Sequence, residues 1–360
     1  MSNQTTVITL FSSDSTVQYI KDIFSVLSLP RGSGFQFRYQ SNYVDPRVIT
    51  QFSNSKNNLN LKALVAFRSK HSTPNDKCFF IPIRWVRIQS VVNISNGYTV
   101  FFEIDGYPSY LPNFRTASAT FQGINLSAQN FFQTMGNNDY AVWGEPLPIV
   151  NLDDNIDRDS ENWFEIVKSL TLVPDYIDYH FFKCSSPYTE KINNVNSQYE
   201  KVECEKRGHL ITFVEGKCAN IDIEYYSESY DRSKKRQINV LVDNNIISKA
   251  KGLHSILQSR YGTIKLGLQP KKVANNTITE VIITSSSSVN NELETEIAFP
   301  IIVVKNNVQK ITKAFITAAG ALLVALPGII GGSLDIGWNV LIAGMGALVL
   351  GINNYWESKE

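Results

Sequence analysis

The sequence predicts a mainly β fold of the α+β class, with an N-terminal mixed α/β domain, an antiparallel β-sandwich or barrel, and a C-terminal two-helix transmembrane hairpin. Three observations predict this class. Strand-like segments of alternating apolar and polar residues recur through most of the chain. Two uncharged runs of seventeen residues each follow near its end. A chain of 360 residues also has room for two cores ahead of these runs.

The N-terminal domain is expected over residues 1–150, as a mixed α/β, β-rich sensing or docking domain. It opens with the strand-like segment TVITLFSS, and a short helix is expected over residues 15–27. A further strand is expected at FQFRYQSNYV. Three more are expected over residues 61–69, 78–92 and 97–107, with a break at Pro82.

A linker and a helix are expected over residues 151–175, ahead of an antiparallel β-sandwich domain over residues 176–305. The acidic stretch NLDDNIDRDSEN is typical of an exposed linker, and NWFEIVKSLTLV has helical spacing. After Tyr176, short strand-like segments alternate with turn signals about every 10 to 15 residues. Such spacing favours a sandwich or barrel.

The transmembrane hairpin is expected over residues 311–356. Its two runs lack the polar face that a soluble helix pair needs, and the short turn between them makes the helices antiparallel. Small residues recur along one face of each helix and would let the backbones approach closely in lipid. This seam joins the two helices of one hairpin, or also joins protomers in a ring or pore. The packing positions are Ala314, Ala318, Ala321, Ala325, Gly328, Gly337, Gly344, Ala347 and Gly351.

Flanking residues predict how the hairpin lies in the membrane. Basic side chains precede the first helix and aromatic rings flank the second, which gives the interfacial anchors Lys310, Lys313, Trp338, Tyr355 and Trp356. The positive-inside rule places the body and the C-terminus in the cytoplasm and predicts location in the inner (cytoplasmic) membrane. Residues 1–12 have neither a basic region nor a long apolar run, so no signal peptide is expected, and the four cysteines suit a reducing compartment.

Two groups of basic residues are candidates for binding an anionic ligand. One loop offers a contact for anionic lipid or nucleic acid, or is only a solvated hairpin tip: Arg232, Lys234, Lys235 and Arg236. A second group interleaves arginines with aromatic residues, as in sites for RNA or a nucleotide: Arg31, Arg38, Arg84 and Arg87 beside Phe35, Phe37, Tyr39 and Trp85. The overall charge is balanced, with 34 Lys and Arg against 33 Asp and Glu, so such contacts must be local.

The residue patterns predict a protein that is not an enzyme, with no catalytic residue, no metal site and no cofactor. The four histidines fall in no metalloprotease or nucleophile motif, and no phosphate-binding glycine loop is present. Cys204, His209 and Cys218 lack the paired spacing of a zinc site. The aspartates within residues 153–159 lack the ligand order of a calcium loop.

The layout of a β-rich body before a two-helix hairpin at residues 314–352 resembles membrane effectors of prokaryotic antiviral defence, particularly the transmembrane partner proteins of short Argonaute systems. The resemblance is one of architecture. It implies abortive infection: a sensor activates the body, and the protein then oligomerises and permeabilises or depolarises the inner membrane in defence against phages and plasmids. The implied partners are the lipid bilayer, further copies of the chain and a sensor protein.

Two alternative functions stay open. The hairpin is a static anchor or scaffold that docks a soluble, nucleic-acid-guided partner, or the body is a binding module for lipid or nucleotide. Direct binding of nucleic acid or nucleotide has no specific motif behind it.

Overall fold

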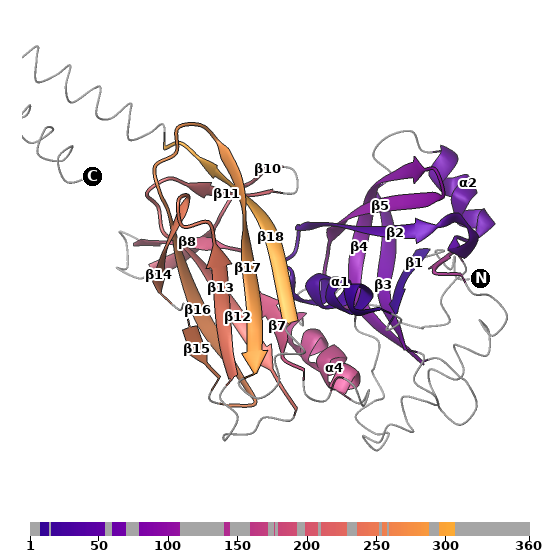
Figure 1. Cartoon of the computed structure of the whole chain (residues 1–360), viewed down its shortest axis with the longest axis horizontal. Coiled ribbons are helices and arrows are strands. Elements are labelled where there is room, and N and C mark those ends of the chain that lie inside the picture. The colour runs from indigo at the N-terminus through magenta and orange to yellow at the C-terminus, as the bar shows by residue number, and fades with distance from the viewer. Residues whose placement is uncertain are drawn as a thin grey trace, which may run out of the picture.

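The computed structural model describes residues 8–13, 16–54, 60–69, 79–108, 140–144, 159–171, 176, 179–192, 199–207, 210–228, 236–251, 254–257, 259–287 and 295–306. Within these residues the chain forms three six-stranded sheets and three α-helices. The N-terminal part holds one sheet and the C-terminal part holds the other two (Figure 1).

The N-terminal sheet has the strand order β2-β5-β4-β3-β1-β6. Its central strand β3 is apolar along its middle, and every residue from Ala63 to Phe67 is fully buried. β1 pairs with β3 in parallel, whereas the other neighbours in this sheet are antiparallel. The strands are β1 (Ile8–Ser13), β2 (Gly34–Gln40), β3 (Leu61–Ser69), β4 (Phe79–Ile94), β5 (Gly97–Ile104) and β6 (Val142–Trp143).

An amphipathic helix, α1 (Val17–Ser28), lies between the two parts of the molecule. The Thr16 hydroxyl caps its start by accepting a hydrogen bond from the Tyr19 N–H at 3.4 Å. The N-terminal sheet lies on one side of α1, and β18 and β7 lie on the other (Figure 1). Its buried apolar residues are Ile23, Phe24, Val26 and Leu27.

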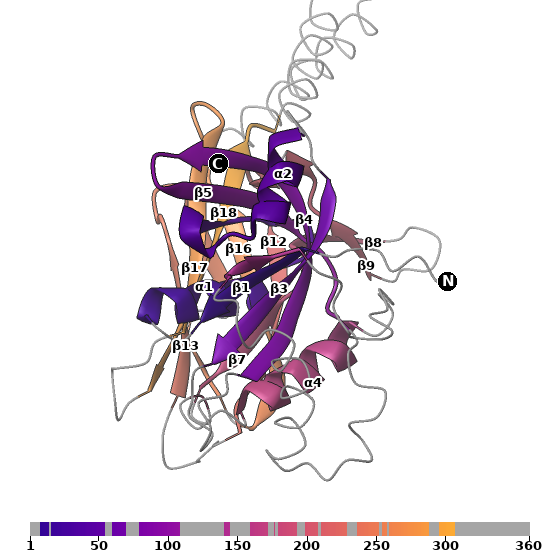
Figure 2. The same ribbon diagram turned by 90° about the vertical axis from the view of Figure 1, so that its right-hand side faces the viewer.

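The other helices cover opposite ends of the N-terminal sheet, as Figure 2 shows. A short 3-10 turn, η1 (Ser41–Tyr43), leads into α2 (Pro46–Asn54). Asp45 fixes the start of α2, because its carboxylate accepts the Arg47 N–H at 2.9 Å and pairs with the Arg47 guanidinium at 2.7 Å. The third helix, α4 (Asp159–Thr171), lies at the end where β7 is found.

The C-terminal part contains two sheets, with the strand orders β10-β11-β18-β17-β13-β15 and β14-β16-β12-β8-β9; β7 also pairs with β12. β11 and β18 run parallel, so this part is not wholly antiparallel. The strands are β7 (Phe181–Cys184), β8 (Tyr188–Ile192), β9 (Tyr199–Glu203), β10 (Lys206–Arg207), β11 (Leu210–Val214), β12 (Ala219–Tyr226), β13 (Arg236–Val242), β14 (Ile247–Lys251), β15 (His254–Ile256), β16 (Tyr261–Pro270), β17 (Thr277–Ser287) and β18 (Thr295–Val304).

One apolar core runs through both parts of the molecule. On the polar side of the contact between α1 and β18, Lys21 pairs with the Glu296 carboxylate at 3.5 Å, and the Ser25 hydroxyl donates to the Glu296 carbonyl oxygen at 3.4 Å. On its apolar side, Phe24 contacts three rings edge to face. These rings belong to Tyr176, Tyr179 and Phe181, with centroids 5.6, 4.8 and 5.3 Å from that of Phe24.

The predicted fold class needs correction. The described chain is mostly strand, as the mainly β prediction expected, but its C-terminal part holds two sheets with a parallel pair, β11–β18, rather than a simple antiparallel sandwich. The helices serve as covers and as a link between sheets, because each buries one face against strands.

The predicted transmembrane hairpin is not upheld. No helix among the described residues is long and apolar enough to cross a membrane. The longest of them, α4, has 13 residues. Such a helix rises about 20 Å, against a hydrocarbon thickness of about 30 Å. The segment 311–356 lies outside the described residues. The predictions of a transmembrane pore and of an inner-membrane location are withdrawn with the hairpin.

Candidate functional site

A carboxylate just after β5 holds two arginines near the contact between the two parts. The Asp105 carboxylate accepts from Arg31 Nη2 at 2.6 Å, from Arg87 Nε at 3.0 Å and from the Gly106 N–H at 3.0 Å. Burial alone would raise the pKa of Asp105, but the Arg87 hydrogen bond and the two guanidinium charges hold that pKa below its ordinary value. Asp105 therefore stays ionised and fixes the direction of both guanidinium groups.

A third cation reaches the same place from the C-terminal part. Lys206, on the short strand β10, donates from Nζ to the carbonyl oxygen of Arg31. Gly32 follows with a φ of 79°, and a Cβ there would collide with the Lys206 ammonium group. The turn after α1 thus favours glycine for its backbone conformation, and a larger residue there would displace the Lys206 ammonium group. We call Arg31, Arg87, Asp105 and Lys206 the junction patch.

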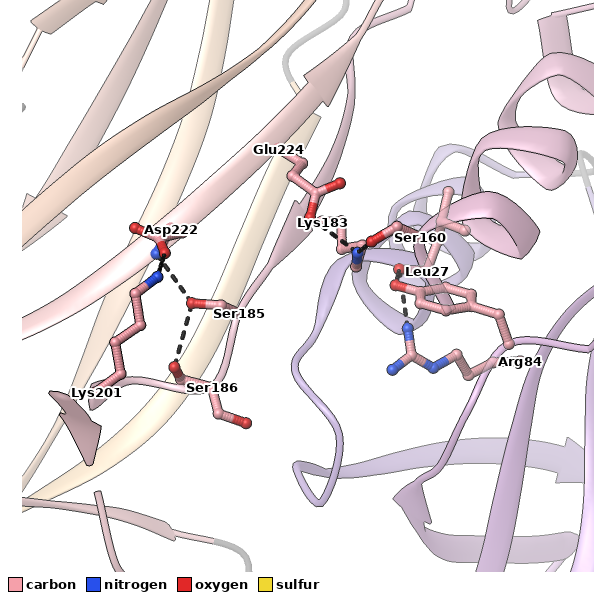
Figure 3. A network of polar contacts seen from close by, with 10 residues as sticks. Leu27, Arg84, Ser160, Lys183, Ser185, Ser186, Lys201, Asp222 and Glu224 are labelled. Carbon is pink, nitrogen blue, oxygen red and sulfur yellow. Dashed lines mark hydrogen bonds and ion pairs between the residues drawn. The ribbon is translucent and has the colours of Figure 1, made fainter. Parts of the chain in front are cut away.

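A fourth cation, Arg84, lies beneath this patch and is only 2% exposed. Its Nε donates to the carbonyl oxygen of Asp105 at 2.6 Å. Its Nη1 donates to the carbonyl oxygen of Leu27 at 3.5 Å (Figure 3). The guanidinium carbon lies 3.5 Å from the ring centroid of Tyr107, whose hydroxyl also donates to the Leu27 carbonyl at 2.6 Å. Arg84 therefore binds an open carbonyl at the end of α1 and serves the fold rather than a ligand.

Polar side chains at the start of α4 join this helix to β7 and to the residues that follow β5. Lys183 of β7 donates from Nζ to the Ser160 hydroxyl at 2.6 Å and to the Glu224 carboxylate at 2.9 Å (Figure 3). Asp159 accepts the Tyr107 N–H at 3.1 Å. These bonds fix the start of α4 against both parts of the chain.

A second polar cluster lies on β8, β9 and β12. The Asp222 carboxylate accepts from the Tyr188 hydroxyl at 2.9 Å and from Lys201 Nζ at 2.8 Å. The Ser185 hydroxyl accepts the Asp222 N–H at 2.9 Å and donates to the Ser186 carbonyl oxygen at 3.2 Å (Figure 3). Each charge in this cluster has a partner within it, so the cluster stabilises the strand order of the sheet.

Two described thiols, those of Cys184 and Cys204, are protonated at neutral pH. Burial raises the pKa of Cys184 to about 12. Burial and the nearby Glu203 raise the pKa of Cys204 to about 11. A protonated thiol is a poor nucleophile and a poor metal ligand. Among the described residues, no group of three or more His, Cys, Asp or Glu side chains could hold a metal ion.

The structure places the sequence-predicted residues in different surroundings. It brings Arg31, Arg84 and Arg87 together around Asp105, while Arg38 lies on the exposed face of β2. The rings interleaved with these arginines pack inward: Phe37, Tyr39 and Trp85 are buried and Phe35 is half-buried. These rings therefore offer no stacking platform for a base.

Most of the other predicted residues lie outside the described residues. Arg236 begins β13, but the rest of the basic loop, Arg232, Lys234 and Lys235, is not described. The same holds for Lys310, Lys313, Ala314, Ala318, Ala321, Ala325, Gly328, Gly337, Trp338, Gly344, Ala347, Gly351, Tyr355 and Trp356. The packing and anchoring roles depended on the transmembrane hairpin and are withdrawn with it, whereas the role of the basic loop stays a prediction.

Sequence reasoning missed Asp105 and Lys206, which complete the junction patch. Asp105 stands in the segment IDG at the end of a strand-like run, a position typical of a turn carboxylate. Nothing in the sequence joins it to Arg31 or to Lys206, because that contact depends on the packing of the two parts. No protein-family model and no curated protein matches the chain, so its site is interpreted from geometry alone.

Proposed function

We propose that the described body is a non-catalytic docking module, which binds an acidic segment of a partner protein at the junction patch. The observation that carries this proposal is the pair of arginines fixed on one carboxylate. The Arg31 and Arg87 side chains are 41% and 50% exposed although both are bonded to Asp105. A guanidinium group has five N–H donors, so each arginine keeps donors for a ligand.

The charge of the patch favours an anion of modest charge. Two cations pair with the one carboxylate, and Lys206 binds the carbonyl oxygen of Arg31, so the patch carries a net charge of +2 (three minus one). Glu103 stands directly across from Arg87 in the β4–β5 register and lowers the local charge further. A mixed patch of this kind suits a protein surface that carries a few carboxylates.

Two features favour a protein partner over a nucleic acid. The aromatic rings near the arginines pack inward, whereas single-stranded nucleic acid is usually bound on exposed rings. The balanced overall charge also supplies no broad positive field for a polyanion. From the predicted role in antiviral defence, the proposal keeps only one element, which is that the partner is a sensor protein.

The ionisable groups support docking over catalysis. The pKa values of Asp45 and Asp105 are held below the ordinary value by arginine partners, although burial alone would raise them. A general acid or base at neutral pH needs the opposite shift. The raised thiol pKa values of Cys184 and Cys204 argue in the same direction.

The proposal is tested by fluorescence anisotropy with the full chain and a labelled ten-residue peptide of Asp and Glu. Wild type is expected to bind, with affinity that falls as salt rises. Arg31→Gln and Arg87→Gln should each weaken binding on the order of tenfold, because each removes a charged hydrogen-bond donor.

The matched control is Lys217→Gln, which removes an exposed cation from the turn before β12. It should bind as wild type does, and circular dichroism should show all variants folded. Equal binding by Arg31→Gln and wild type would contradict the proposal. Tighter binding of a ten-nucleotide single strand, lost in the same variants, would assign the patch to nucleic acid instead.

A further inference from the structure

One sheet edge differs from all the others among the described strands. Proteins protect edge strands with short length, charge, proline or bulges, since an open edge pairs with other chains. β2 ends the N-terminal sheet, has seven residues, GFQFRYQ, and contains neither proline nor lysine. Its pairing with β5 runs without a register shift. β2 therefore carries little of the usual protection.

The remaining described edges are protected. β6 and β10 have two residues each and β15 has three. β7 has four residues and packs against α1. β9 is short and carries three charged residues in YEKVE, and β14 is broken by a register shift. Among the described edge strands, β2 is therefore the one most open to pairing with a strand of another chain.

The register fixes which groups β2 offers at its open edge. The Ser41 N–H donates to the Asn96 carbonyl at 3.1 Å, and the Ile104 N–H donates to the Ser33 carbonyl at 2.8 Å. In an antiparallel pair, hydrogen-bonded and non-hydrogen-bonded residues alternate along each strand. The odd-numbered residues between Ser33 and Ser41 therefore bond to β5. The N–H and C=O groups of Gly34, Gln36, Arg38 and Gln40 point the other way. The last three side chains are exposed.

We propose that β2 pairs with β2 of a second copy of this chain, antiparallel about a two-fold axis at Phe37. This register sets Gln36 opposite Arg38 of the partner, and Gly34 opposite Gln40. It joins the whole strand, forms about eight main-chain hydrogen bonds, and extends the sheet continuously across both copies. An isologous contact of this kind closes as a dimer.

Charge selects this register over its neighbour. A shift of two residues in one direction sets Arg38 opposite Arg38, and like charges directly opposite are unfavourable. The same shift in the other direction pairs only residues 34–38 of the strand. In the proposed register, each Arg38 guanidinium faces a neutral amide that can accept its hydrogen bond. The strand is therefore complementary to itself.

Sedimentation velocity over a dilution series of the full chain tests the proposal, with charge changes at Gln36. Gln36→Arg sets two like-charge pairs across the axis and should raise the dimer dissociation constant on the order of tenfold. Gln36→Glu sets two opposite-charge pairs and should lower that constant. Gln36→Pro removes an outward N–H while sparing the bonds to β5, so it should also weaken the dimer.

The matched controls are Asn93→Arg and Asn93→Glu, which place the same charges on the exposed side of the inner strand β4. They should leave the dissociation constant unchanged. A chain that is monomeric at every concentration would overturn the proposal. So would a dimer that Gln36→Arg and Gln36→Glu shift in the same direction, because the register requires opposite signs.

Discussion

At the scale of single residues, one carboxylate both orders the junction patch and contributes to stability. Asp105→Asn keeps the shape of the side chain but removes the charge that Arg31 and Arg87 share. Hydrogen bonds between charged groups contribute more than neutral ones, so we expect the free energy of unfolding to fall by about 2 kcal/mol. Urea titration at pH 7 measures this loss. Glu280→Gln, at an exposed position on β17, should change it by less than about 0.5 kcal/mol.

The same carboxylate gives stability a dependence on acid. The pKa of Asp105 is lowered in the folded chain, whereas an unfolded Asp has a pKa of about 3.9. Its stabilisation is therefore complete above about pH 4 and is lost as the pH falls through the folded pKa. The gap in unfolding free energy between wild type and Asp105→Asn should narrow from pH 6 to pH 3.

The pKa of Asp45 is also lowered in the folded chain, so protonation of Asp45 destabilises wild type and Asp105→Asn alike in acid. This contribution cancels in the difference between the two proteins. A difference in unfolding free energy that stays constant down to pH 3 would mean that the arginine partners do not lower the pKa of Asp105 in the folded chain. Urea titrations at pH 6, 5, 4 and 3 give the comparison.

At the scale of elements, α1 is the helix on which both parts depend. Phe24 is 3% exposed and contacts rings of the C-terminal part. Phe24→Ala leaves a cavity there and should cost about 3 to 5 kcal/mol of unfolding free energy. Differential scanning calorimetry should also show a broader or split transition, because the two parts lose their shared packing. Val17→Ala, at a position 66% exposed on the same helix, should have almost no effect.

Local elements could be predicted from the sequence where the pattern was strong. A helix expected over residues 15–27 is found as α1, and the segment 61–69 is β3. The expected break at Pro82 is wrong, because β4 continues through it. A register shift takes up the proline: Arg84 faces Val65 while Pro82 faces Ala66, which leaves Ile83 as the extra residue of a bulge. Sequence alone does not distinguish a bulge from a strand end.

At the scale of the whole molecule, the apolar core is shared between segments predicted as separate domains. The predicted domain of residues 1–150 contains α1, whose buried face packs on β18 and β7. Produced alone, residues 1–150 should expose that face, bind a hydrophobic dye and melt well below the full chain. Co-production with residues 151–360 should restore a stable complex on size exclusion. A fragment 1–150 that melts like the full chain would show that the shared core contributes little.

The arrangement of sheets and the junction patch could not be predicted, for a common reason. Periodicity reports which side of a strand is buried, but not which strand lies beside it. The parallel pair β1–β3, the contact of α1 with β18 and the approach of Lys206 to Arg31 all join distant segments. Charge-free runs near the C-terminus led instead to a fold class built around a hairpin, which the described helices do not support.

The contact between α1 and β18 can form only after a delay during synthesis, because the two segments are far apart in the sequence. Ser25 and Glu296, which are hydrogen-bonded across it, stand 271 residues apart. At translation rates of about 5 to 20 residues per second, the ribosome needs roughly 15 to 50 s to deliver the second after the first. During that time the apolar face of α1 has no native partner from β18. The nascent N-terminal part must therefore wait in an unfinished state, and chaperones that shield apolar helices should be found on it until β18 emerges.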